Sequence, residues 1–232
     1  MAVRRTLVLV VWGCLLAGCP PPPPVTSAEF DQAEIVQIYS VGYDAEQDLI
    51  FLAAKFYVGG LSLQLTPPSD VAHNHFELDE VTEVPGDIAV YTWYTYSGEG
   101  YEAYHRWRWT DTGGLTYINE FTFTPTYLDD PPSEISRSLG GTVSFLPALQ
   151  EGESVAVYIS SESGEGQAFW ARDVGATTVE IDPDPLERFG EEEDLEIEVW
   201  RVGLYDLQEA TPRGGRIEAE HHSAHLPVRL GP

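Results

Sequence analysis

Six histidines are the residues of this chain whose chemistry suits either metal binding or proton transfer. They are His73, His75, His105, His221, His222 and His225. Alternation along extended backbone places His73 and His75 on one face, and His221 and His225 on one face with His222 opposite. Zinc needs three or four ligands, yet no H-E-x-x-H spacing accompanies these residues. Surface imidazoles in polar turns are therefore favoured over a zinc site.

Carboxylates dominate the charge of the chain. Asp and Glu number 38 against 12 Lys and Arg, which gives a formal charge of −26 at pH 7. This balance argues against nucleic acid as a partner, because nucleic-acid binding needs a basic surface. Calcium takes 6–8 oxygen ligands, and the weak candidates for it are Asp182, Asp184 and Asp194. None of them fits a spaced calcium loop, so we predict no metal or cofactor and leave calcium as an alternative.

Aromatic residues gather between positions 91 and 117. On a strand, Trp107 and Trp109 share a face with His105, while Arg106 and Arg108 occupy the other. One aromatic face is expected to fill a core. The alternative is an exposed, flat face on which sugars stack. Its candidate ligand-binding residues are Trp93, Trp107 and Trp109.

Patterns for catalysis are weak. Nucleophilic hydrolysis needs a Ser or Cys on a sharp turn with a His base, and the sequence contains no G-x-S-x-G elbow or phosphate-binding loop. Glycoside hydrolysis needs two carboxylates about 5–9 Å apart in a cleft, and nothing in the sequence selects such a pair. We therefore predict a protein that is not an enzyme, with a hydrolase using unpatterned acidic residues as an alternative.

The elements that must position these residues are short strands. Apolar and polar residues alternate with a period of two, and Gly, Pro and Asp clusters separate the runs. About seven strands are expected before residue 126, including a hairpin formed by residues 88–96 and 104–110. No helical period persists over three turns, and only residues 183–189 suggest a helical turn. The spacing predicts an antiparallel sandwich.

The first nineteen residues have the form of an export signal. Arg4 and Arg5 precede an apolar run that is too short to span a bilayer, which needs about 20 residues. The following Leu16-Ala17-Gly18-Cys19 resembles the lipobox of bacterial lipoproteins. That resemblance implies cleavage before Cys19 and lipidation of its thiol. Cys14 would leave with the signal, so the mature body would have no disulfide.

Five prolines, residues 20–24, follow Cys19 and predict a semi-rigid polyproline spacer. A composition change at residues 127–138, with Asp129-Asp130-Pro131-Pro132, predicts a linker. Beyond it, Gly141 to Leu149, Glu153 to Ser160 and Leu195 to Arg201 resemble an immunoglobulin-like domain of bacterial surface and periplasmic lipoproteins. The resemblance implies a module for binding or spacing and transfers no catalytic residue.

The sequence therefore predicts an all-β protein with two tandem antiparallel β-sandwich, immunoglobulin-like domains after a signal peptide and proline-rich stalk. The expected segments are a signal peptide at 1–18, lipidated Cys19 with a stalk at 19–30, sandwiches at 31–126 and 139–232, and a linker at 127–138. The expected function is a non-catalytic binding or structural module anchored in the cell envelope, facing the periplasm or the outer surface. Its expected partners are the membrane, through the lipid on Cys19, and a glycan or envelope protein. A carbohydrate-binding lipoprotein is the first alternative.

Overall fold

The computed structural model describes residues 25–74, 76–81, 90–96, 102–190 and 194–232, with the side chains of 79–81 and 93–96 outside the description. The all-β prediction is confirmed. The described helices are short 3-10 turns: η1 (Ser27–Glu29), η2 (Gln32–Glu34) and η3 (Asp184–Phe189). The last of these is the helical turn predicted at residues 183–189.

The strands fall into two groups, the first half (residues 25–126) and the second half (residues 127–232). The first half contains β1 (Val25–Thr26), β2 (Val36–Asp44), β3 (Leu49–Val58), β4 (Leu61–Gln64), β5 (Asp70–His73), β6 (Phe76–Glu77), β7 (Asp79–Val81), β8 (Val90–Tyr96), β9 (Tyr104–Thr110) and β10 (Thr116–Thr122). The second half contains β11 (Tyr127–Asp129), β12 (Glu134–Ser136), β13 (Gly141–Leu146), β14 (Glu153–Ser160), β15 (Gly166–Ala171), β16 (Thr178–Ile181), β17 (Asp194–Asp206), β18 (Gly215–His222) and β19 (Leu226–Gly231).

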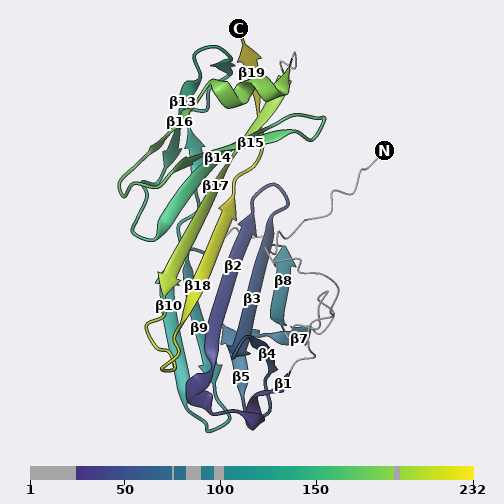
Figure 1. The fold of residues 1–232 in the computed structure, drawn as a ribbon, viewed down its shortest axis with the longest axis vertical. Helices are drawn as coiled ribbons and strands as arrows, with labels where there is room; N and C mark the ends of the chain where they lie inside the picture. The colour runs from purple at the N-terminus through teal and green to yellow at the C-terminus, as the bar shows by residue number, and fades with distance from the viewer. Residues whose placement is uncertain (1–24, 75, 82–89, 97–101, 191–193) are drawn as a thin grey trace.

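One twelve-stranded sheet runs through both halves. Its main path is β1-β4-β3-β2-β18-β17-β14-β15. The long strand β17 pairs with β14 and β19 near its start and with β18 near its end, and β18 pairs in parallel with β2. Figure 1 shows an elongated molecule in which β17 and β18 lead from one half into the other. The two halves are therefore joined by main-chain hydrogen bonds.

The first core lies between this sheet and a second sheet of order β10-β9-β5-β6. Strand β9 alternates between exposed and buried residues, as its sequence predicts, and its buried side supplies Trp107 and Trp109. Trp107 stacks on Tyr39 of β2 with ring centroids 4.9 Å apart, and Trp109 lies 5.1 Å from Phe56 of β3. Burying large aromatic rings in this way provides much of the apolar contact in a small core.

The second core lies between strands β14 and β17 and a three-stranded sheet of order β11-β13-β16. Alternate residues of β14 point inward, so Val155, Val157 and Ile159 are buried. They meet Val143 and Phe145 of β13 across the sandwich. This arrangement is the two-layer packing expected when two sheets each have one apolar face.

One local expectation was wrong. Residues 88–96 and 104–110 do not form a hairpin, because β8 pairs with β3 and β7 while β9 pairs with β5 and β10. The segment expected to be a linker contains β11 and β12, which pair with β13 and β19. In addition, Ile217 of β18 belongs to the first core. The first core therefore includes a residue that follows residues 127–138 in the sequence.

Close approach of β18 to β2 depends on one glycine. A Cβ atom added to Gly215 would lie 2.0 Å from the carbonyl oxygen of Gln37. Since no real Cβ atom tolerates that distance, only glycine lets β18 start its parallel pairing at this point. Thr211 supports the same junction by donating a hydrogen bond from its hydroxyl to the Ile35 carbonyl oxygen.

Candidate functional site

Two of the three tryptophans proposed for sugar stacking are buried. Trp107 and Trp109 are both 0% exposed. The indole nitrogen of Trp109 donates to the Ser69 hydroxyl at 3.1 Å inside the first core. Of the two alternatives for these rings, the structure therefore supports core packing. The side chain of Trp93 lies outside the described residues.

The weak calcium candidates lie around the η3 turn. Asp182 and Asp184 are exposed, and the Asp182 carboxylate accepts a hydrogen bond from the Asp184 amide at 3.2 Å. Asp194 is exposed at the start of β17, and the acidic residues just before it lie outside the description. Within the described part of the chain, no three His, Cys, Asp or Glu side chains are arranged to hold a metal ion.

The C-terminal histidines do not share faces in the way that the sequence predicted. Along β18, His221 is buried whereas His222 lies on the outer face, and His225 follows the end of that strand. The chain turns after residue 222, so His225 is on the side of His222 rather than of His221. Seven residues make up this site, which we call the acidic seam: Asp44, Glu46, Glu196, Glu198, Glu220, His222 and His225.

His225 forms the centre of the acidic seam. Its Nδ1 atom lies 3.1 Å from Glu196, and its Nε2 atom lies 3.2 Å from Glu198 and 3.3 Å from Glu46. Glu196 and Glu198 belong to β17, whereas Glu46 belongs to the turn between β2 and β3. One imidazole therefore links the first half of the molecule to the second.

His222 forms the other part of the seam. Its Nε2 atom lies 2.6 Å from Glu220, and its Nδ1 atom lies 3.9 Å from Glu198. On its other side it packs against Trp200, with ring centroids 4.9 Å apart, and Trp200 stacks on Tyr158 of β14 at 4.6 Å. The aromatic rings hold His222 in place beside the carboxylates.

The protonation of the seam follows from these contacts. Burial alone would lower the pKa of His222, but the hydrogen bond to Glu220 and the nearby carboxylates outweigh it and raise that pKa. The pKa of His225 is raised for the same reason, by Glu196, Glu198 and Glu46 against the effect of burial. Burial raises the pKa of Glu198. The charged imidazolium forms are therefore favoured in this site.

A second histidine site lies inside the first core. The Nε2 atom of His73 and the Nδ1 atom of His105 are 3.1 Å apart, and both residues are almost fully buried. Burial, together with the charge of His105, lowers the pKa of His73 to about 3. Burial lowers the pKa of His105 to about 4. This pair is neutral at pH 7. His75, the other residue of the expected His73–His75 motif, lies outside the description.

Arg201 of β17 is the centre of a buried polar network between the two cores. It is 0% exposed and forms an ion pair with Glu153, while its guanidinium also donates to the carbonyl oxygens of Pro147 at 2.8 Å and Ala148 at 2.9 Å. Glu153 in turn accepts a hydrogen bond from the Tyr205 hydroxyl at 2.8 Å. Buried ions that are paired and fully hydrogen-bonded in this way fix a geometry rather than create a reactive group.

Tyr205 continues this network into the first half. Its ring packs on Phe121 at 5.5 Å and on Phe123 at 6.5 Å. The following loop, between β17 and β18, binds to β10 through Asn119. The Asn119 amide donates to the Glu209 carbonyl oxygen at 2.9 Å and accepts from the Glu209 amide at 3.0 Å. The end of β17 is therefore embedded in the first half.

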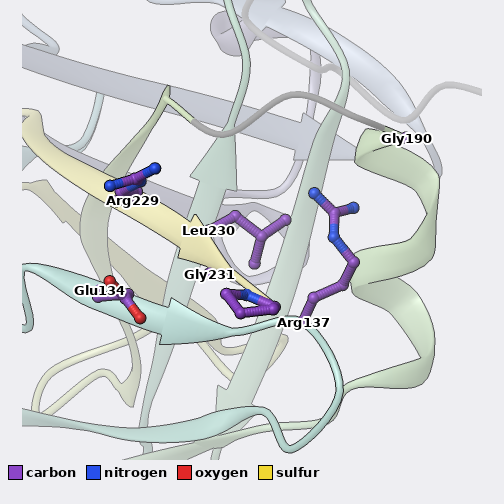
Figure 2. A pocket seen from close by; sticks show the side chains of 7 residues that line it. Glu134, Arg137, Gly190, Arg229, Leu230 and Gly231 are labelled. Atoms are coloured by element: carbon purple, nitrogen blue, oxygen red, sulfur yellow. The ribbon is translucent and has the colours of Figure 1, made fainter.

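A cavity of about 620 Å³ lies at the end of β19. Figure 2 shows the side chains of Glu134, Arg137 and Arg229 around it. Arg229 is in register with Glu134 on β12 and with Asp194 on β17. The lining of the cavity therefore contains charged side chains of both signs, one glutamate and two arginines.

Part of the acidic seam has a signal in the sequence. Alternation along residues 220–225 places Glu220 and His222 on one face, and Glu196 and Glu198 alternate in the same way on β17. The contribution of Asp44 and Glu46 has no such signal. They approach only because β18 pairs with β2, a contact between strands far apart in the sequence.

Comparisons with known proteins do not identify a family for the chain. No family model matches the chain, and no curated protein matches it. One solved structure that it resembles is the crystal structure of a tetra-tandem repeat in the extending region of a large adhesion protein, with 10% sequence identity and a TM-score of 0.25. The match covers 84% of this chain and 49% of the other, so the chain spans about half the length of that structure. Its function must therefore be inferred from its own residues.

Among the residues that the structure describes, no helix has both the length and the apolar character that a membrane crossing requires.

Proposed function

We propose that the chain is a lipid-anchored, exported envelope protein whose β body is a non-catalytic structural or binding module. The observation that carries the proposal for the body is the way its halves are joined. One sheet continues through both of them, and the Arg201 network and the acidic seam connect them on either side of that sheet. An elongated body of this kind would hold a binding surface at a fixed distance from the membrane anchor.

The proposal for the anchor rests on the N-terminal sequence. Leu16-Ala17-Gly18-Cys19 follows an apolar run, and five prolines follow Cys19. A diacylglyceryl group on Cys19 would hold the protein stably, since two acyl chains are sufficient where one is marginal. The prolines would extend about 3.1 Å per residue and hold the body away from the bilayer. The body would then face either the periplasm or the outside of the cell.

Partners of the proposed module are the membrane, through Cys19, and a glycan or protein of the envelope. The strongly acidic composition supports a soluble body with no affinity for nucleic acid. Burial of Trp107 and Trp109 removes two of the three tryptophans on which sugar binding by the first half was based. A protein partner is therefore the better-supported choice.

Lipidation of Cys19 tests the anchoring part of the proposal. We would express the full chain in a bacterium fed an alkyne-labelled fatty acid and separate membrane from soluble fractions. The native chain is expected to carry the label and to sediment with membranes. Cys19→Ser is expected to lose both properties, whereas the matched control Cys14→Ser, which changes the cysteine inside the signal, is expected to keep them. A labelled, membrane-bound Cys19→Ser protein would contradict the proposal.

A further inference from the structure

We propose that the acidic seam is a pH-sensitive clasp, which holds the β2–β3 turn against the second half while His222 and His225 carry protons and releases it when they lose them. This goes beyond the proposed function, because it assigns a conformational response to the body. It stands whether or not Cys19 is lipidated.

The acidic seam lies where the two halves of the molecule meet. The turn between β2 and β3 belongs to the first half, and it meets β17 and the end of β18 at this point. The main chain makes one of the contacts there, because the Ala45 amide donates to the His222 carbonyl oxygen at 2.9 Å. The side-chain contact is made by His225, which lies between Glu46 of the turn and Glu198 of β17.

Five carboxylates surround the two imidazoles of the acidic seam. The groups that face the two imidazoles come from three parts of the chain: Asp44 at the end of β2 with Glu46 in the turn that follows, Glu196 and Glu198 on β17, and Glu220 on β18. Two imidazolium ions separate these five carboxylates. When the imidazoles are neutral, like charges from the two halves face one another, and Glu198 is only 7% exposed and poorly screened by water.

The remaining charged neighbours lie on the opposite face of the sheet. His221 is buried there, and burial together with the charges of His222 and Arg201 lowers its pKa to about 4. His221 is therefore neutral over the range in which the seam titrates. Arg201 remains paired with Glu153 throughout. The response of the clasp is thus assigned to His222 and His225.

The direction of the response follows from the raised pKa values of His222 and His225. A histidine with a raised pKa in the folded state adds stability below its unfolded pKa of about 6.5 and loses that contribution as the pH rises through the folded value. The clasp is therefore closed in mild acid and opens in mild alkali. The rest of the sheet need not separate, since β18 and β2 remain paired along their length.

Hydrogen–deuterium exchange of the Ala45 amide tests the clasp. The full chain, purified in detergent, would be measured at pH 5.5 and pH 8.5, with protection factors corrected for intrinsic exchange. We expect the Ala45 protection factor to fall severalfold at the higher pH, because the charged contacts that hold the turn are lost. The Leu204 amide, which donates to the Gly152 carbonyl oxygen at 2.8 Å, serves as the internal reference and should not change.

Three variants distinguish the clasp from a general effect of pH. His225→Gln should show low Ala45 protection at both pH values, and His225→Arg, with a permanent charge, should keep high protection at both. Glu218→Gln, which removes an exposed ion pair with Arg216 on the same strand, should behave as the native chain.

Unchanged protection of Ala45 in the native chain would overturn the proposal, as would a native pH response in His225→Gln. If His225→Gln also loses Leu204 protection, it has unfolded, and His225→Arg decides the matter. If His225→Arg retains Ala45 protection at pH 8.5, the clasp is supported. If His225→Arg loses that protection, the proposal is overturned.

Discussion

The two histidine sites of this protein respond to protons in opposite ways. His73 and His105 pair with each other inside the first core, where burial lowers the pKa of each. His222 and His225 also lose solvent, but carboxylates surround them and their pKa values rise. Burial is common to both sites, so the neighbouring charges decide the direction. Acid should therefore weaken the first core and strengthen the acidic seam.

The largest effect expected from this comparison is acid destabilisation through the buried pair. In the unfolded chain, His73 and His105 bind protons as the pH falls below about 6.5. In the folded chain they bind protons only near pH 3 and pH 4, respectively. Stability is therefore complete above pH 6.5 and falls as the pH decreases, by on the order of 3 kcal/mol per histidine at pH 4. Urea unfolding at pH 7, 5.5 and 4 would measure this loss.

The double variant His73→Leu/His105→Leu is the matched test of that loss. Leucine has a volume similar to that of histidine, and replacing both partners of a buried hydrogen bond by apolar groups can be nearly neutral. We expect the variant to lose less stability than the native chain between pH 7 and pH 4, with the loss that comes from buried His221 remaining. The interpretation would be wrong if the variant lost as much stability as the native chain.

A smaller effect is expected when only one member of the buried pair is replaced. His105→Leu at pH 7.5 removes the partner of the His73 Nε2 atom, and an unpaired buried polar group costs about 1–3 kcal/mol. The double variant should then be more stable than the sum of the single variants predicts. A double-mutant cycle from urea unfolding measures this coupling. Additive single effects would show that the two rings do not depend on each other.

A still smaller effect is expected from removing one charge of the acidic seam. Glu198 faces both His222 and His225, so Glu198→Gln should lower the pKa of both histidines. Histidine titration followed by NMR would report the shift. Glu218→Gln, on the outer part of β18, should leave both pKa values unchanged. Equal shifts in the two variants would assign the effect to overall charge rather than to contact.

The smallest effect is expected from salt, which should shift the pKa values of His222 and His225 but not those of His73 and His105. Raising the ionic strength from 0.1 M to 1 M shortens the Debye length from about 10 Å to about 3 Å. Since the carboxylates around His222 and His225 are partly exposed, salt should move these two pKa values back toward 6.5. His73 and His105 owe their shifts mainly to burial and should not respond. The same NMR titration, repeated in salt, would show whether all four histidines respond alike.

Several properties of this protein were determined by the sequence alone. The period of two along residues 104–110 predicted that Trp107 and Trp109 share a face. The helical turn before Phe189 was also predicted correctly. These features are local, because backbone geometry and turn chemistry depend on residues next to one another. The lipid on Cys19 stays a prediction of the same local kind.

The tertiary structure decided which strands pair and which faces are covered. Alternation groups Trp107 with Trp109, but only the sheet of β2 and β3 opposite them makes that face a core. In the same way, residues 220–225 place a histidine beside a glutamate, but only the parallel pairing of β18 with β2 brings Glu46 to His225. Strand pairing joins segments far apart in the chain, and its free energy depends on both partners. The sequence of a single segment therefore cannot specify which strand it pairs with.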